Sequence, residues 1–110
     1  MADDTADDTL RALAATIRDR RGATAEASYT KSLLDAGAAR CARKFGEESI
    51  EAIVAALQSD RDGLRGEAAD VVYHLLVLLE AADVAFDDVL MDLRERMRQS
   101  GHAEKASRGA

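Results

Sequence analysis

Proline and tryptophan are absent from the sequence, and aromatic residues make up only 4% of its 110 residues. Strands are enriched in aromatic and β-branched side chains, so this composition offers few strand formers. Alanine, leucine, glutamate, aspartate and arginine dominate instead, and most of these residues favour helices. The sequence therefore predicts an all-α fold.

Three further features are missing: a cysteine pair, a leader segment and a long apolar run. Cys41 is the single cysteine, so no internal disulfide can form, which is typical of a reducing compartment. The segment Met1–Leu10 is acidic and polar, unlike a signal peptide. The longest apolar run, Val71–Leu79, is interrupted by His74 and is too short to cross a bilayer. We therefore expect a cytoplasmic protein without a membrane partner.

An excess of basic residues is also lacking. The chain carries 15 basic and 21 acidic residues, for a formal net charge of −6. Proteins that bind nucleic acid through its phosphates usually present a basic face or a basic excess. Here the basic residues are interleaved with acids, so we expect no nucleic-acid partner.

What the sequence does contain fits one globular domain over residues 1–110. Hydrophobic residues make up 47% and charged residues 33%, a globular composition. We expect about seven residues at the start and about ten at the end to be flexible. A chain this short buries a limited core unless it pairs with a partner. A homodimer that completes a shared core is therefore expected.

Helical spacing and capping signals predict a bundle of four to five helices. The first follows Leu10, Leu13 and Ile17, and Ser28 and Asp60 are N-cap candidates for two others. The expected spans are Asp8–Arg20, a short helix from Ser28 to Gly37, Ala38–Leu57, Arg61–Ala82 and Phe86–Arg98.

Acidic residues three positions apart occur on two consecutive predicted helices. Glu48 is paired with Glu51 on one helix, and Glu67 with Asp70 on the next. Residues at this spacing share one helix face, with Cβ atoms about 5–6 Å apart. A short connection makes the two helices antiparallel neighbours. Four carboxylates can therefore converge on one point.

The second of these helices gives the stronger signal. Glu67, Asp70 and His74 form one polar stripe, while the rest of Val71–Leu79 is apolar nearly all the way round. Such a helix is normally enclosed by others, and burying an unpaired charge is costly. A divalent cation relieves the repulsion, and carboxylate oxygens favour Mg²⁺, with Mn²⁺ as a substitute.

Interpretations in which these residues have no functional role remain open. Acid pairs at this spacing are common on solvated helices, and Lys44 with Glu48 has the spacing of a surface ion pair. Periodicity alone does not settle which of Glu47, Glu48 and Glu51 point inward. We interpret His74 as a hydrogen-bonded core residue and Cys41 as a small buried hydrophobe. A di-iron bundle would need Glu-x-x-His on two helices, and no second histidine lies near the acids.

Several segments together resemble one known family. They are Ser28-Tyr29-Thr30, Lys44-Phe45-Gly46-Glu47-Glu48 with Glu51, Glu67-Ala68-Ala69-Asp70 with Tyr73-His74, and Glu104-Lys105-Ala106-Ser107-Arg108. In this order they resemble the phosphoribosyl-ATP pyrophosphohydrolase family, part of the MazG-like all-α NTP pyrophosphohydrolase superfamily. The resemblance extends over about residues 8–108. The acid pairs indicate the superfamily, and the other segments indicate the particular family.

The resemblance implies Mg²⁺-dependent hydrolysis of phosphoribosyl-ATP to phosphoribosyl-AMP and pyrophosphate, the second step of histidine biosynthesis. By this likeness Glu48, Glu51, Glu67 and Asp70 would bind the metal, and Glu47 would be a neighbouring ligand or activate water. Three basic residues are candidates for binding substrate phosphate: Lys44, Lys105 and Arg108.

Two alternatives to this function stay open. The first is a housekeeping pyrophosphohydrolase of the same superfamily that acts on (d)NTPs, because it would use the same acid pairs. The second is a non-enzymatic helical interaction module, in which the acids would pair with arginines of another subunit.

Overall fold

The part of the chain that the computed structural model describes, residues 2–99, consists of helices and turns without a strand. The predicted all-α class is therefore confirmed. In chain order the elements are α1 (Ala2–Asp19), a short 3-10 turn η1 (Arg20–Gly22), α2 (Tyr29–Ala36), α3 (Ala38–Leu57), α4 (Arg61–Ala81) and α5 (Phe86–Met97). No helix among these is both long and apolar enough to span a bilayer.

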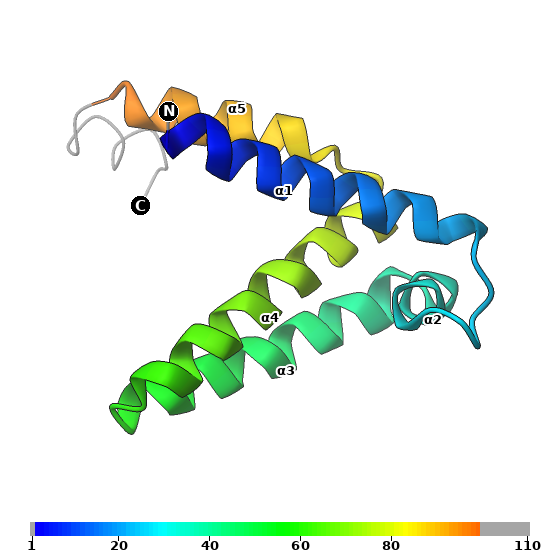
Figure 1. Ribbon diagram of the computed structural model, residues 1–110, viewed down its shortest axis with the longest axis horizontal. Coiled ribbons are helices and arrows are strands. Elements are labelled where there is room, and N and C mark those ends of the chain that lie inside the picture. The colour runs from blue at the N-terminus through cyan, green and yellow to red at the C-terminus, as the bar shows by residue number, and fades with distance from the viewer. Residues whose placement is uncertain (1, 100–110) are drawn as a thin grey trace.

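Helices α3 and α4 form an antiparallel hairpin, the two long ribbons in the lower part of Figure 1. The connection is short, and in it Ser59, which follows the C-cap residue Gln58, adopts a left-handed φ of 57°. The Asp60 side chain then accepts a hydrogen bond from the Gly63 amide at 2.9 Å, which caps the start of α4. This tight turn places the acidic segments of the two helices opposite each other.

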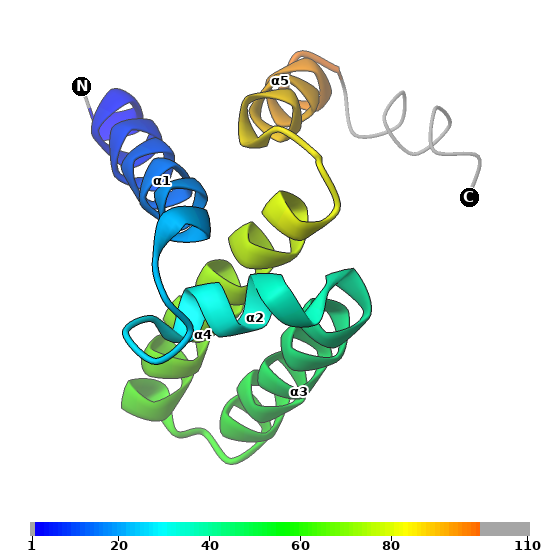
Figure 2. The ribbon, with the colours of Figure 1, turned by 90° about the vertical axis from the view of Figure 1, so that its right-hand side faces the viewer.

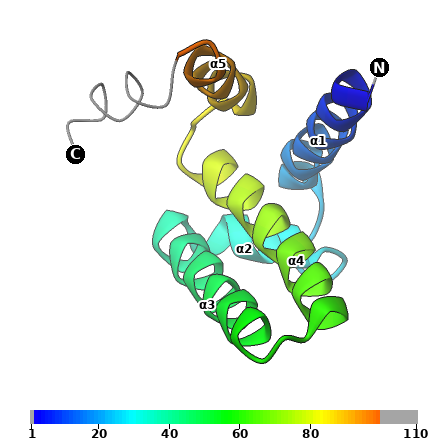
Figure 3. The ribbon, with the colours of Figure 1, turned by 90° about the vertical axis from the view of Figure 1, so that its left-hand side faces the viewer.

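The short helix α2 crosses the α3–α4 hairpin, as Figure 3 shows. Its N-cap is Ser28, whose hydroxyl accepts a hydrogen bond from the Lys31 amide at 3.2 Å. Gly37, with a φ of 94°, ends α2 and leads directly into α3. Because only glycine adopts such a φ readily, this residue allows the sharp change of direction. Both ends of α2 therefore lie where the sequence predicts them.

Helices α1 and α5 lie at the C-terminal end of α4, the upper part of Figures 1 and 2. Ion pairs join the two helices: Arg11 Nε lies 2.8 Å from Asp87 Oδ1, and Arg94 Nη2 lies 2.5 Å from Asp7 Oδ2. Helix α1 begins at Ala2 and not at Asp8 as predicted. Asp7 lies in the added part of the helix and pairs with Arg94 of α5, a contact between distant residues that apolar spacing does not reveal.

The core gathers side chains from four helices: Ile17, Leu33, Cys41, Leu76 and Val77. The Cys41 thiol is buried, and burial raises its pKa above the ordinary value, so the thiol stays protonated at neutral pH. Its prediction as a buried hydrophobe is confirmed.

The apolar face of α3 has no cover within the described chain. Its four residues remain largely exposed: Ile50 (62%), Ile53 (57%), Val54 (45%) and Leu57 (81%). Val72 on α4 is also 39% exposed, so the described part of a single chain does not enclose this part of the helix. The radius of gyration, 15.9 Å, exceeds the roughly 13 Å expected for a compact domain of this length.

Candidate metal centre

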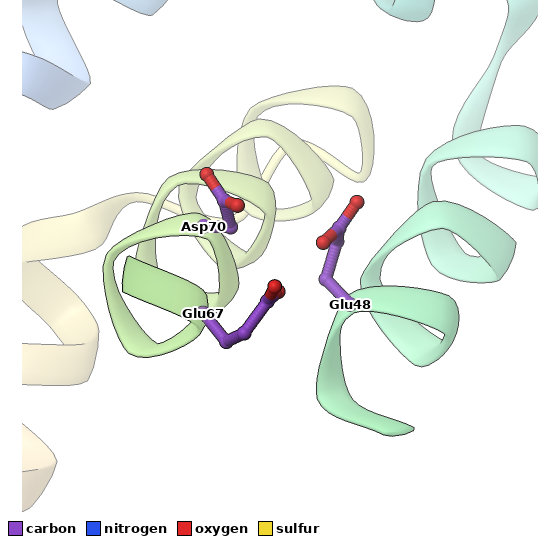
Figure 4. A group of neighbouring side chains, drawn as sticks. All are labelled: Glu48, Glu67 and Asp70. Atoms are coloured by element: carbon purple, nitrogen blue, oxygen red, sulfur yellow. The ribbon is translucent and has the colours of Figure 1, made fainter. Parts of the chain in front are cut away.

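Three of the predicted acids meet between α3 and α4. Glu48 comes from α3, and Glu67 and Asp70 come from α4, one helical turn apart. One carboxylate oxygen from each lies within 4.8 Å of the other two. Figure 4 shows the side chains directed into the space between the helices. We refer to Glu48, Glu67 and Asp70 as the acid cluster.

The surroundings of the cluster do not balance its charge. Glu67 Oε2 is buried and has no hydrogen-bond partner among the described residues. The Glu48 side chain is only 13% exposed, and its Oε1 lies 3.6 Å from Lys44 Nζ. Converging carboxylates repel one another, and a buried oxygen without a partner costs free energy. A cation that prefers oxygen ligands would relieve the repulsion between the carboxylates and give the buried oxygen a partner. The residues present therefore fit such an ion.

Lys44 lies at the edge of the cluster. Its Nζ is 3.6 Å from both Glu47 Oε1 and Glu48 Oε1. Its pKa is raised above the ordinary lysine value, first by Tyr29 and then by the two glutamates, while desolvation acts in the opposite direction. Lys44 therefore carries a full positive charge at neutral pH.

Two predicted acids lie outside the cluster. Glu51 is exposed on α3 and, with Glu67, lines a neighbouring cavity of about 310 Å³ between α3 and the start of α4. Glu47 is 54% exposed and forms an ion pair with Lys44. The structure thus brings together three of the four predicted metal ligands. The remaining phosphate-binding candidates, Lys105 and Arg108, lie outside the described residues.

His74 is buried at 6% exposure, and both of its ring nitrogens face protein groups. Nδ1 lies 2.8 Å from the Asp70 carbonyl oxygen, and Nε2 lies 3.5 Å from the Tyr29 hydroxyl. The prediction of a hydrogen-bonded core histidine is confirmed. Within residues 2–99 the acid cluster consists of carboxylate oxygens, the ligands that hard divalent ions prefer.

Tyr29 is a residue of this neighbourhood that residue patterns alone did not indicate. It is 45 positions from His74, so no helical periodicity connects the two. The resemblance offered the only signal, because Ser28-Tyr29-Thr30 and Tyr73-His74 both belong to the segments that define it. Thr30 Oγ1 and the Tyr73 hydroxyl form a second hydrogen bond between the same two segments.

The fold and the site define a class: an all-α protein with three converging carboxylates between two antiparallel helices. Residues 10–97 match the family model described as Phosphoribosyl-ATP pyrophosphohydrolase, and the chain belongs to this family.

Relatives named phosphoribosyl-ATP pyrophosphatase are similar over nearly their whole length. The protein from Roseobacter denitrificans is 56% identical over 100 residues, which is 91% of this chain and 95% of the relative. That from Ruegeria pomeroyi is 57% identical over 99 residues, covering 90% and 94%. That from Rhodobacter capsulatus is 54% identical over 100 residues, covering 91% and 97%. The family indicated by the sequence segments is confirmed.

Proposed function

We propose that this chain hydrolyses phosphoribosyl-ATP to phosphoribosyl-AMP and pyrophosphate, the second step of histidine biosynthesis, with Mg²⁺ at the acid cluster. The family and the names of the relatives support the reaction. The observation that supports the metal is the buried, unpartnered Glu67 Oε2 beside two further carboxylates. Mn²⁺ is a suitable substitute because it also prefers oxygen ligands.

The chain's own residues have distinct tasks in this proposal. Glu48, Glu67 and Asp70 hold the ion, which when bound neutralises phosphate charge and stabilises the leaving pyrophosphate. Lys44 binds a phosphate oxygen from the α3 side, and Lys105 and Arg108 bind phosphate from the C-terminal segment.

Glu51 and Glu47 have proposed roles next to this cluster. Glu51 is proposed as the fourth ligand because it lines the same cavity as Glu67. In the proposed hydrolysis, water would attack phosphorus, and either an acid such as Glu47 or the metal held by the acid cluster would orient it; the two routes are alternatives.

We propose that two copies of the chain associate through the exposed apolar face of α3. Four side chains on this face, Ile50, Ile53, Val54 and Leu57, are 45–81% exposed in one copy. Apolar patches of this kind usually mark a protein interface. We also propose a cytoplasmic location, supported by the buried free thiol of Cys41, which suits a reducing compartment.

The substrate test is turnover of phosphoribosyl-ATP beside ATP and dNTPs, with Mg²⁺ and with a chelator. Pyrophosphate release should be fastest with phosphoribosyl-ATP and should stop when the metal is removed. Preferential release from dNTPs would favour the housekeeping alternative. Absence of turnover with every nucleotide would favour the interaction module.

The ligand assignment predicts that Asp70→Asn and Glu51→Gln lower kcat by more than about a hundred-fold, because even outer-shell partners of metal ligands cost 10–100-fold. Circular dichroism should show an unchanged helical content. Asp92→Asn, at an exposed position of α5, is the matched control and should turn over like wild type. Wild-type rates in both amide variants would contradict the assignment.

A further inference from the structure

The cavity of about 310 Å³ beside the acid cluster opens toward the α3–α4 turn, the lower end of the hairpin in Figure 1. Glu67 belongs both to the lining of this cavity and to the acid cluster. Pockets for small molecules usually have volumes of about 300–1,000 Å³. A ligand whose phosphates reach the acid cluster can therefore extend past Glu67 into the cavity.

The cavity has an apolar wall and a polar end. Ile50, Val54 and Ala55 of α3 form the apolar wall. Ile50 and Val54 are 62% and 45% exposed, so both have apolar surface left for a ligand. Gln58, the C-cap residue of α3, and Asp60, the N-cap residue of α4, form the polar end. An apolar wall with few polar groups is typical of a pocket that holds a flat organic ring.

Gln58 is the polar group of this end that is available to a ligand. The Asp60 carboxylate already accepts a hydrogen bond from the Gly63 amide at 2.9 Å. The Gln58 side chain is exposed and makes no hydrogen bond within residues 2–99. A primary amide carries a donor beside an acceptor, and this pair matches the amino group and N7 of adenine.

The order of residues along α3 gives the ligand a direction. Lys44, which is proposed to bind phosphate, lies one helical turn before Glu48, and the cavity begins after Glu48. Gln58 lies ten residues after Glu48, about 15 Å along the helix axis. An extended nucleoside triphosphate with its phosphates at the acid cluster therefore has its base at the Gln58 end.

We propose that this cavity binds the adenine base of the substrate, with the ring packed on Ile50 and Val54 and with Gln58 as the residue that recognises adenine. The Gln58 amide donates to N7 and accepts from the amino group of the base. This inference rests on the proposed function, because the acid cluster must receive the triphosphate for the base to reach the cavity.

Competition by ATP and ITP against phosphoribosyl-ATP, with saturating Mg²⁺, tests the recognition of the base. In ITP a carbonyl oxygen replaces the amino group, so Gln58 loses one of its two hydrogen bonds. ATP should inhibit wild type about ten-fold more strongly than ITP, within the range of discrimination that a bidentate amide gives. Equal inhibition by the two nucleotides would overturn the inference without the need for any variant.

Gln58→Leu should inhibit this recognition and leave the phosphate site intact. ATP and ITP should then inhibit within about two-fold of each other, and KM for phosphoribosyl-ATP should rise about ten-fold with kcat within about two-fold of wild type. Inorganic tripolyphosphate has no base, so its inhibition should match that of wild type. A retained preference for ATP, or equally weakened tripolyphosphate inhibition, would contradict the role of Gln58.

The apolar wall is tested by Val54→Ala, which should raise KM for phosphoribosyl-ATP about five-fold because it removes two buried carbon atoms from the contact with the ring. Ile53→Ala is the matched control, since Ile53 lies on the same exposed face of α3 but outside the cavity lining. Its KM should stay within about two-fold of wild type. Equal rises of KM in both variants would assign the wall to association between copies and overturn the inference.

Failure of the proposed function gives a different result. Wild type would then release no pyrophosphate from phosphoribosyl-ATP with Mg²⁺, and both proposals would fall together. Intact turnover without discrimination between ATP and ITP would overturn only the assignment of the cavity.

Discussion

Glu67 differs from the other acids of the cluster because one of its oxygens is buried and has no partner in the part of the chain that the structure describes. A carboxylate in this state costs free energy, and a bound cation would relieve that cost. In the proposed metal site, Glu67 would therefore couple metal binding to folding more directly than the exposed Asp70.

Glu67→Gln should stabilise the metal-free protein by about 1 kcal/mol, because the amide removes one of three like charges and can donate to Glu48 or Asp70. The variant should also lose the rise in melting temperature that Mg²⁺ gives to wild type. Thermal unfolding with and without Mg²⁺ measures both effects. Asp92→Asn should keep the wild-type Mg²⁺ response, and an undiminished response in Glu67→Gln would contradict the assignment.

Residue spacing predicts which acids face each other, but not their final positions. The sequence predicts the pair of Glu67 and Asp70, because both lie on one polar stripe of an otherwise apolar helix. Glu48 and Glu51 share one helix face, and the packing of α3 against α4 decides that Glu48 meets the cluster while Glu51 faces a cavity. The contact between Tyr29 and His74 spans 45 positions, so only the tertiary fold brings it about.

The α3–α4 turn keeps the acid-bearing helices in register, and one cap stabilises it. Asp60 accepts from the Gly63 amide at 2.9 Å, and a Cβ built on Gly63 would collide with the Asp60 carboxylate. A Cβ on Gly66, one turn later, meets nothing within 4 Å. The two glycines of α4 are therefore predicted to respond differently to alanine.

Asp60→Ala should cost about 1 kcal/mol of stability through the lost cap. Gly63→Ala should be nearly neutral alone, because its gain in helix propensity of about 1 kcal/mol is offset by displacing that cap, and should stabilise the Asp60→Ala protein by about 1 kcal/mol. Gly66→Ala should stabilise both backgrounds equally. Urea unfolding at one protein concentration measures the cycle, and additive effects of Asp60→Ala and Gly63→Ala would show that a methyl group at Gly63 does not displace the cap.

Helix positions were predictable because capping and apolar spacing are local. Ser28, Gly37 and Asp60 mark boundaries that the structure places at the same points. Apolar spacing did not predict the start of α1, where Asp7 pairs with Arg94, 87 positions away. Local sequence signals thus predict the packed part of each helix, whereas contacts between distant residues are not visible in them.

The whole molecule is more open than a single chain of this length requires. Its radius of gyration is 15.9 Å, and large apolar side chains of α3 face the solvent. Both features follow if half of the core belongs to a second copy. Each Å² of apolar surface that association buries stabilises the pair by about 25 cal/mol. The cavity beside Glu51 shares Ile50 and Val54 with this face, so association would also affect access to the site.

Light scattering at micromolar concentration should give the mass of a dimer for wild type. Ile53→Lys should shift the protein toward monomer, because it places a charge in the centre of the proposed interface. Met91→Lys, at an equally exposed apolar position of α5, is the matched control and should remain dimeric. A monomeric wild type would contradict association. Loss of the dimer only in Met91→Lys would show that the interface lies on α5 and not on α3, as proposed.

The most direct measurement of the central claim is anomalous diffraction from crystals grown with Mn²⁺ and a non-hydrolysable triphosphate. A peak is predicted between α3 and α4, about 2.1–2.2 Å from carboxylate oxygens of Glu48, Glu67 and Asp70. A map without a peak at this position, with the three side chains turned to solvent in every copy, would contradict the account.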